Sequence, residues 1–253
     1  MLNPYDFDSV GRHLAPSGRL RVAINLGNPV LAQRNPHTHE PQGISVELAK
    51  RLAKQLGLVM EIIEYDAAGK VVEALDSDNP ADHWDLAFLA RDPLRGETIG
   101  FTRPYVLIEG CYLVRKDSDI NTNLDLDQPG MRVSVNKGAA YDLHLSRNLV
   151  QAEVVRAEDG QTAAEIFLEQ GLDAAAGVRQ SLTQIAAENP DLKVLDENFM
   201  TIDQAMCVPK TALCGNNCIA QEYLQDFVRE QKRNGFVRRW LNSNGQHNVT
   251  VAD

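Results

Sequence analysis

The sequence predicts an α/β protein built from two similar lobes, and a repeated pattern supports this. Residues 20–25 and 131–136 are two apolar strands, each introduced by a glycine and an arginine and each ending at an asparagine. Each is followed, a few dozen residues later, by a helical stretch and an aspartate-led apolar strand, at residues 84–89 and 172–176. Two small α/β lobes that face each other form a cleft, which is where a ligand binds.

The elements of the first lobe follow from periodicity and turn signals. Gly27 and Pro29 form a turn that places Asn28 at the carboxyl end of a buried strand, where ligands of open α/β sheets bind. Apolar residues recur at helical spacing over residues 43–56, and Gly57 is typical of a helix C-cap. The expected elements are, in order, a strand at 20–26, a helix at 43–56, a strand at 60–65, a short helix at 71–75 and a strand at 84–90.

Two long apolar stretches are expected to link the lobes. Residues 105–115 stand between the two halves and form the first crossing, and residues 199–208 form the return crossing. Residues 219–241 then supply one or two amphipathic helices that rejoin the first lobe. Two crossing strands favour a closing motion. The predicted divisions are an N-terminal arm at 1–17, a first lobe at 18–108 plus 199–253, and a second lobe at 109–198 with helices from about 140 and at 161–169 and strands at 153–156 and 172–177.

Composition and charge exclude several classes of protein. With 43% hydrophobic and 24% charged residues among 253, the chain has the composition of an ordinary globular protein. Its net charge of -10 argues against a nucleic-acid partner, because phosphate binding needs a concentrated basic face. We expect no membrane insertion, since there is no long apolar run. Residues 1–19 lack the basic start and apolar core of a secretory signal. As the sequence stands, we expect a cytoplasmic protein, or a periplasmic one if the sequence is a trimmed mature form.

The cysteines leave the redox compartment open. They fit two disulfides in an exported protein or four thiols in a cytoplasmic one: Cys111, Cys207, Cys214 and Cys218. The spacing of Cys214 and Cys218 lacks the second pair of ligands that a zinc site needs, and His37 and His39 have no partner at the usual spacing. We therefore expect no metal and no cofactor.

Five stretches, in order over residues 18–245, carry a family pattern. They are GRLRV at 18–22, GISVELA at 43–49, PLR at 93–95 with FTRPY at 101–105, RVSVNKG at 132–138 and GLDA at 171–174. This set resembles the type II solute-binding proteins of family 3, which serve polar amino acids in ABC transport. The resemblance implies a two-lobed, type II periplasmic-binding-protein-like fold with two hinge crossings, whose cleft closes on a small polar solute.

The resemblance assigns the ligand's carboxylate to Arg95. In the family, a loop after a first-lobe strand supplies an arginine, and its planar guanidinium matches a carboxylate bidentately. The alternative is a solvated loop arginine. Asp92 stands where a threonine is usual, so it either orients Arg95 or meets a cationic part of the ligand.

The second lobe departs from the family at the position that normally receives the ligand's ammonium group. The family usually has an aspartate after this strand, whereas residues 173–180 offer apolar residues and Arg179 there. If Arg179 faces the cleft, an ordinary α-amino acid loses its ammonium partner. The alternative is an exposed arginine at a helix start.

A second departure lies earlier in the second lobe, at the turn that precedes the helix expected from about residue 140. Hydroxyl residues are common at this turn in the family. Here the turn reads Gly138, Ala139, Ala140 and Tyr141. Backbone N–H groups at a helix start still hold an anion, and Tyr141 can replace one hydroxyl. The aromatic residue that commonly stacks on the ligand is also absent, with Asn28 in its region.

Basic side chains outnumber acidic ones near the expected cleft. They are Arg91, Arg95, Lys70 and Arg179 against Asp92 and Glu109. Lys70 has the alternative interpretation of a solvated lysine. This balance favours an anionic or carboxylate-rich solute over a basic amino acid.

We therefore expect non-catalytic binding of a small carboxylate-bearing solute, amino-acid-like or an organic acid, in an interlobe cleft. The expected partners are this solute and either an ABC-transporter permease or a protein that senses the closed state. One alternative is an enzyme on the same scaffold, similar to cyclohexadienyl dehydratase. It would need a positioned acid or base, for which Glu109, Asp92 and His144 are the candidates, without a recognisable constellation. The other is an intracellular sensor whose ligand-induced closure is read by another protein.

Overall fold

The computed structural model describes residues 5–157, 160–210 and 219–253, and it divides into two α/β units. Unit 1 comprises the described residues up to Leu107 and from Asp203 onward, and unit 2 comprises those between. Two long strands, β7 (Val106–Arg115) and β12 (Met200–Pro209), run through the two division points. The chain therefore leaves unit 1 once and returns once, which confirms the predicted α/β class with two crossings.

The sheet of unit 1 is built around β1. Its strand order is β4-β1-β5-β12, and β1 is parallel to both β4 and β5, whereas β12 is antiparallel to β5. β6 pairs with β12, β13 pairs with β7, and β2 and β3 form a separate hairpin. The bounds are β1 (Arg19–Asn25), β2 (Gln33–Arg34), β3 (Pro41–Gln42), β4 (Val59–Tyr65), β5 (Leu86–Ala90), β6 (Ile99–Phe101) and β13 (Thr250–Val251).

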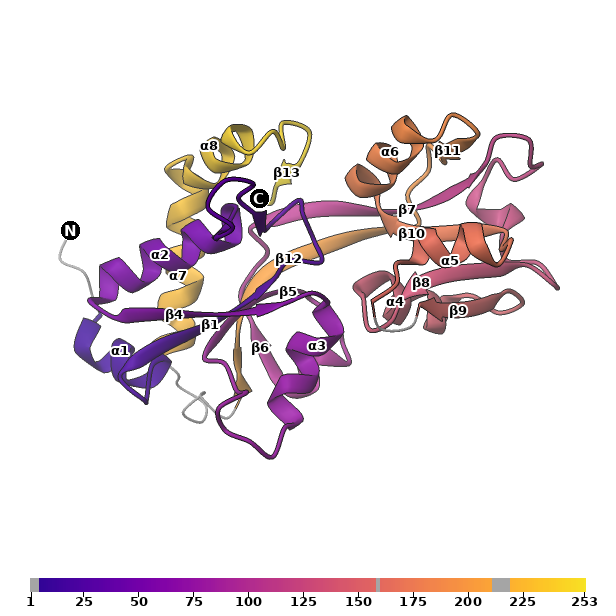
Figure 1. Ribbon diagram of the computed structural model, residues 1–253. Helices are drawn as coiled ribbons and strands as arrows, with labels where there is room; N and C mark the ends of the chain where they lie inside the picture. Colours follow the sequence, from indigo (N-terminus) through magenta and orange to yellow (C-terminus); the bar gives the residue numbers. More distant parts are fainter. Residues whose placement is uncertain (1–4, 158–159, 211–218) are drawn as a thin grey trace. The chain divides into compact units, whose positions relative to one another are not determined.

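Helices cover both faces of this sheet (Figure 1). α2 (Ile44–Leu56) packs on β1 and β4, and its leucines are buried, as the helical spacing predicts. On the other face, α3 (Ala68–Glu73) packs against Trp84 and the strands β1 and β5. The remaining helical elements of unit 1 are α1 (Phe7–Leu14), η1 (Ala74–Asp76), η2 (Arg95–Glu97), α7 (Ile219–Arg233) and α8 (Phe236–Ser243). Among the described residues, no helix is long and apolar enough to cross a membrane.

The N-terminal helix belongs to the body of unit 1 and is not a separate arm. Val10 and Leu14 of α1 are buried, and α1 packs against α2 and α7. The ring of Tyr5 lies 5.2 Å from that of Tyr223 on α7, in an edge-to-face arrangement. The expectation that the body begins at Gly18 is therefore corrected by this apolar packing.

Unit 2 has a parallel core of three strands with helices packed on it. Its strand order is β7-β10-β8-β9, where β8 is parallel to β9 and β10, and β10 and β11 are antiparallel to β7. α5 packs on β8 and β10 and contributes Phe167 to the buried core. The bounds are η3 (Asn123–Asp125), β8 (Arg132–Asn136), α4 (Ala140–Asn148), β9 (Glu153–Ala157), α5 (Ala163–Glu169), β10 (Ala174–Val178), α6 (Arg179–Glu188) and β11 (Leu192–Val194).

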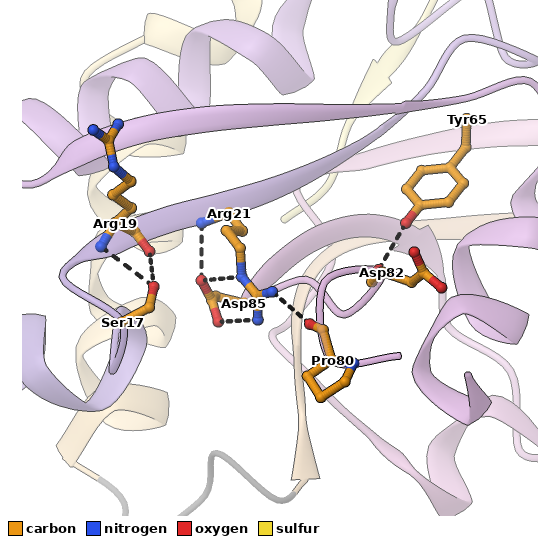
Figure 2. A network of polar contacts seen from close by, with 7 residues as sticks. All are labelled: Ser17, Arg19, Arg21, Tyr65, Pro80, Asp82 and Asp85. Atoms are coloured by element: carbon orange, nitrogen blue, oxygen red, sulfur yellow. Dashed lines mark hydrogen bonds and ion pairs between the residues drawn. The ribbon is translucent and has the colours of Figure 1, made fainter. Parts of the chain in front are cut away.

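The repeated sequence pattern produces the same pair of hydrogen bonds in each unit. We call this pair of bonds, between an arginine backbone and the aspartate of the next strand, the aspartate anchor. In unit 1 the backbone N–H of Arg21 donates to the Asp85 carboxylate at 2.9 Å, and the N–H of Asp85 donates to the Arg21 carbonyl at 2.8 Å. In unit 2 the corresponding bonds join Arg132 and Asp173, at 2.7 Å and 3.0 Å. Each anchor ties a first strand to the aspartate-led strand beside it. Figure 2 shows the hydrogen bond from the Arg21 backbone N–H to the Asp85 carboxylate in unit 1.

Candidate functional site

Three predicted segments of unit 1 follow neighbouring parallel strands. Asn28 follows β1, Lys70 follows β4, and the loop containing Arg91 and Arg95 follows β5. Because parallel strands end at the same edge of a sheet, these segments share the carboxyl edge, where ligands of open α/β sheets bind. The fold thus brings them to one edge of unit 1.

Arg95 is the most deeply buried charged side chain at this edge. It begins η2 and is 3% exposed, and its Nη1 donates to the carbonyl of Ala90 at 3.0 Å. Burial lowers the pKa of Arg95 from its ordinary value, and the charge of Asp92 opposes this shift. Asp92 is itself buried and accepts a hydrogen bond from the backbone N–H of Leu94 at 2.9 Å. The loop therefore holds a desolvated guanidinium beside a carboxylate that orders the turn.

Asn28 lies in a tight turn directly after β1. Its backbone carbonyl accepts from Leu31 at 3.0 Å and from Ala32 at 3.1 Å, which fixes the turn. The turn abuts the start of α2, where Gly43 has φ 124° and a Cβ would lie 2.4 Å from the Leu31 carbonyl oxygen. Within residues 5–157, 160–210 and 219–253, the amide oxygen Oδ1 of Asn28 is shielded from solvent and has no hydrogen-bond partner. An acceptor of this kind is rare in a folded protein.

The other two basic residues at this edge have acidic partners. Nη1 of Arg91 lies 3.6 Å from the Asp203 carboxylate, and Nζ of Lys70 donates to Asp66 at 2.9 Å. Both pairs are partly exposed, where such pairs contribute little to stability. Lys70 also lines a pocket of unit 1 whose other charged side chains are all acidic: Glu61, Glu64, Glu73 and Asp82. The predicted excess of positive charge is therefore smaller than the sequence indicated.

At the carboxyl edge of unit 2, the start of α4 is already partnered by its own chain. Gly138 has φ 71°, and its N–H donates to the Asp142 carboxylate at 2.8 Å, while the N–H of Ala139 donates to the carbonyl of Asn136. Asp142 also pairs with Arg156 at 3.0 Å. The N–H groups of the first two turn residues are thus engaged in this structure.

The two residues that follow this turn are buried. Ala140 is the first residue of α4, and Tyr141 is 9% exposed. Burial raises the pKa of Tyr141, and the charge of Asp142 raises it further, so the phenol stays neutral. The hydroxyl of Tyr141 therefore stands in a desolvated environment.

Arg179 begins α6, and its side chain bonds to its own unit. Nε forms an ion pair with Glu109, Nη1 donates to the carbonyl of Leu195 at 3.1 Å, and Nη2 donates to that of Asp196 at 2.8 Å. All three guanidinium nitrogens are thus engaged. The guanidinium joins β7, α6 and the segment that leads to β12. Arg179 thus begins a helix, and its side chain is 27% exposed.

The next residue, Gln180, was not predicted. It lies two positions after the end of β10, and its amide oxygen Oε1 is shielded and has no partner within the described part of the chain. A glutamine after a strand is too common to stand out in a sequence, so its lack of a partner becomes visible only in the folded structure.

The three candidate catalytic groups each have a structural role. Glu109 pairs with Arg179, Asp92 accepts the Leu94 N–H, and the ring of His144 stacks on Phe199 with centroids 5.9 Å apart. No three His, Cys, Asp or Glu side chains within the described ranges converge as metal ligands would.

The two described cysteines are free thiols in the cores of the crossing strands. Cys111 in β7 and Cys207 in β12 are both fully buried. Burial raises the pKa of Cys111 to about 12 and also raises that of Cys207. Cys214 and Cys218 lie outside the described residues.

Two α/β units joined by two crossing strands, with polar side chains after the carboxyl ends of parallel strands, define the class of two-lobed solute-binding proteins. The chain matches the model of bacterial extracellular solute-binding proteins, family 3, over residues 20–242, and it belongs to this family.

Relatives of known name agree with this assignment. A glutamine-binding protein of Geobacillus stearothermophilus is 26% identical over 183 residues, which are 72% of this chain and 69% of that protein. A mutant of ArgBP from T. maritima has a TM-score of 0.73 at 22% identity, over 92% of this chain and 98% of that one. An ancestral amino acid-binding protein, described as a precursor of cyclohexadienyl dehydratase, has a TM-score of 0.72 at 19% identity, over 93% and 98%. The two structural likenesses establish the fold alone.

Proposed function

We propose that this protein binds a small carboxylate-bearing solute, amino-acid-like or an organic acid, by closing its two lobes on it, and releases it unchanged. Arg95 carries the proposal. It lies at the carboxyl edge of parallel strands, where solutes bind, and its guanidinium is desolvated. A desolvated guanidinium gains more from a planar carboxylate than a solvated one does.

The names of the relatives support this substrate class. The glutamine-binding protein is named for an amino acid, and so is the amino acid-binding ancestor among the solved structures. The solute would be held by Arg95 and Asn28 of unit 1, with Arg91, Asp92 and Lys70 around them. On unit 2 it would meet the segment Gly138, Ala139, Ala140 and Tyr141, while Arg179 would act as a positioning residue through its bonds to Glu109 and the 195–196 carbonyls.

A thermal-shift screen followed by calorimetry tests the proposal. The panel holds the common L-amino acids, their deaminated acids, dicarboxylates and aromatic acids, since a ligand of the folded state raises the melting temperature. We expect at least one carboxylate to bind, and Arg95→Lys to weaken it about 100-fold because a lysine cannot form the bidentate pair. Arg19→Met, exposed at the amino end of β1 and so at the opposite edge of the sheet, is the control and should change affinity less than threefold.

Two results would refute the proposal. One is a panel in which no carboxylate shifts the melting temperature. The other is an Arg95→Lys variant that is folded and binds as well as the parent protein.

Transport and sensing would both use closure of the lobes on the solute. The two roles differ in the protein that recognises the closed state. Capture of a permease only in the presence of the bound solute supports transport, and capture of another protein supports sensing. An enzyme would convert the solute. Mass spectrometry of the solute recovered after long incubation distinguishes binding from turnover, and an altered mass would replace the binding role by catalysis.

A further inference from the structure

Strand β4 forms one edge of the sheet of unit 1. Among the described strands, only β1 pairs with it. The backbone carbonyl of Tyr65 accepts a hydrogen bond at 2.7 Å from the N–H of Leu26, which directly follows β1. Backbone groups alternate in direction along a strand, so those of Ile62 and Glu64 face away from β1. β4 therefore presents backbone donors and acceptors that an added strand can pair with.

This outer edge of β4 borders a pocket within unit 1. The pocket has a volume of about 800 Å³, which is in the range of ligand-binding pockets. Residues 61–65 of β4 line one side of it, and residues of α3, η1 and the following loop line the other. The hydroxyl of Tyr65 donates to the carbonyl of Asp82 at 3.1 Å, which ties this loop to the strand (Figure 2).

The pocket carries an excess of negative charge. Its charged residues are Glu61, Glu64, Glu73 and Asp82 against Lys70. Lys70 donates to Asp66 at 2.9 Å, and Glu64 pairs with Arg34. The carboxylates of Glu61, Glu73 and Asp82 therefore determine the charge of the pocket, which favours a cationic occupant.

The side chains of β4 determine which residues of an added strand would meet these carboxylates. Ile63 and Tyr65 pack against the core beneath α3, and Glu61 shares their face of the strand because side chains alternate. In a strand added beside β4, every second side chain lies on this same face. Basic residues at alternate positions would therefore lie beside Glu61 and Glu73.

The same carboxylates oppose pairing between two copies of this chain. Two β4 edges brought together would place acidic side chains opposite acidic side chains, which destabilises a strand pair. Charged residues on an edge strand protect a protein against such self-association. They do not oppose a basic partner, so the chemistry of this edge suits a basic segment better than a second copy.

We propose that the outer edge of β4 binds an extended, basic segment of a partner protein, which adds to the sheet as a strand and places arginine or lysine side chains beside Glu61 and Glu73. Main-chain hydrogen bonds supply the affinity of such a complex, and alternate side chains supply its specificity. This role goes beyond the proposed function. Of the residues that line the pocket, Lys70 alone is also assigned to the solute.

Fluorescence anisotropy with the full chain and a labelled, capped seven-residue peptide of alternating arginine and threonine tests the proposal. One comparison peptide has the same composition with its arginines in a row, and a second has glutamate in place of arginine. We expect the alternating peptide to bind at least tenfold more tightly than the first. The second should show no saturable binding.

Two further peptides separate main-chain pairing from the attraction of charges. One is the alternating peptide N-methylated at its arginines, and the other is N-methylated at its threonines. Only one of these sets presents its N–H groups to β4 in an added strand. We expect one peptide to lose at least tenfold in affinity and the other less than threefold.

Variants of the chain locate the site. Ile62→Pro removes an outward-facing N–H without removing a bond to β1, and edge strands tolerate proline, so it should weaken the alternating peptide at least tenfold. If this variant does not fold, the double variant Glu61→Gln with Glu73→Gln decides, and it should weaken the peptide about tenfold. Glu153→Gln, at an exposed position of the edge strand β9 in unit 2, is the matched control and should leave the affinity unchanged.

Several results would overturn the inference. They are no saturable binding of the alternating peptide up to about 1 mM, equal affinity for the peptide with its arginines in a row, equal effects of the two N-methylations, and unchanged affinity in the double variant. A concentration-dependent dimer that Ile62→Pro abolishes would assign the edge to a second copy instead. Arg95→Lys should bind the peptide as the parent protein does, so failure of this inference and failure of the proposed function are distinguishable.

Discussion

The two units are built alike where their first strands begin and differently where they end. Near the amino ends, the aspartate anchor uses the same two backbone hydrogen bonds in each unit, between Arg21 and Asp85 and between Arg132 and Asp173. The side chains differ. The guanidinium of Arg21 also donates to the Asp85 carboxylate and the Pro80 carbonyl, whereas that of Arg132 donates to the backbone carbonyl of Gly171 at 3.4 Å. The aspartate is therefore the shared element, and the ion pair is an addition of unit 1.

At the carboxyl ends, an arginine follows the aspartate-led strand in both units with opposite consequences. Arg95 is buried beside Asp92 in the loop after β5, while Arg179 starts α6 after β10 and bonds to Glu109 and two carbonyls. The two units thus share the aspartate anchor at the amino ends of their strands and differ in the arginine contacts after the carboxyl ends. In an α/β unit, strand pairing fixes the frame, and the loops after the strands are free to specialise.

The largest expected difference between the units comes from removing the aspartates. Asp85→Ala takes an acceptor from a backbone N–H and leaves the Arg21 guanidinium without its carboxylate, which should cost about 3 kcal/mol. Asp173→Ala takes away only the backbone acceptor and should cost about 1.5 kcal/mol. Urea unfolding at pH 7 measures both free energies of unfolding.

The exposed Asp78 and Asp117, one in each unit, provide matched controls. Their alanine variants should stay within about 0.5 kcal/mol of the parent protein. Equal losses for Asp85→Ala and Asp173→Ala would show that the ion pair of unit 1 adds nothing to its anchor.

The next prediction concerns how the free energy of unfolding depends on alkaline pH. Each crossing strand contains one buried thiol, Cys207 in unit 1 and Cys111 in unit 2. Their ordinary pKa is 9.0, and burial raises the pKa of Cys111 to about 12 and that of Cys207 as well. Above pH 9 the unfolded chain has lost protons that the folded chain still binds, so the free energy of unfolding falls as pH rises. From pH 8 to pH 10 each thiol should contribute a loss of about 1.4 kcal/mol.

Alanine variants separate these contributions from those of the buried tyrosines. Cys111→Ala and Cys207→Ala should each reduce the loss between pH 8 and pH 10 by one thiol's share, whatever their stability at pH 8. A pH dependence that neither substitution changes would show that both thiols are accessible to ionisation in the folded protein.

The long elements and the repeat could be predicted from the sequence because they have a period or a fixed spacing. Apolar spacing places α2 at Ile44–Leu56 against a predicted 43–56, and an aspartate-led strand after each repeat corresponds to β5 and β10. The strands β2, β3, β6, β11 and β13 have only two or three residues. They are too short to show alternation, and they form because a partner strand is present.

Positions in the candidate site were predictable, but side-chain directions were not. Asn28 and Arg95 follow strands, so their places at the carboxyl edge of unit 1 follow from the strand prediction. The direction of Arg179 depends on carbonyls 16 and 17 residues further along the chain, which only tertiary packing brings within reach. The lack of a partner for Gln180 is likewise a property of the packed structure.

The comparison of the carboxyl ends is tested by Arg179→Met, which keeps the length of the side chain and removes its donors. Loss of the bonds to Glu109 and to two carbonyls should lower the free energy of unfolding by about 1–2 kcal/mol, with solute affinity changed less than threefold. Lys116→Met, at an exposed position of unit 2, should change neither. A large loss of affinity with intact stability would instead mean that Arg179 contacts the solute.

The smallest expected changes in the free energy of unfolding come from removing the guanidinium groups of Arg21 and Arg132. They test whether the additional bonds of Arg21 stabilise unit 1. Arg21→Met loses the bond to Pro80 at 2.8 Å and two bonds of 3.5 Å to Asp85, so it should cost about 1 kcal/mol. Arg132→Met loses one long bond of an exposed group and should cost less than about 0.5 kcal/mol. A double-mutant cycle of Arg21→Met with Asp85→Asn isolates the ion pair, because the asparagine retains an acceptor for the backbone N–H. A coupling energy near zero would mean that the ion pair adds no stability, so that only the backbone hydrogen bonds stabilise the anchor of unit 1, as in unit 2.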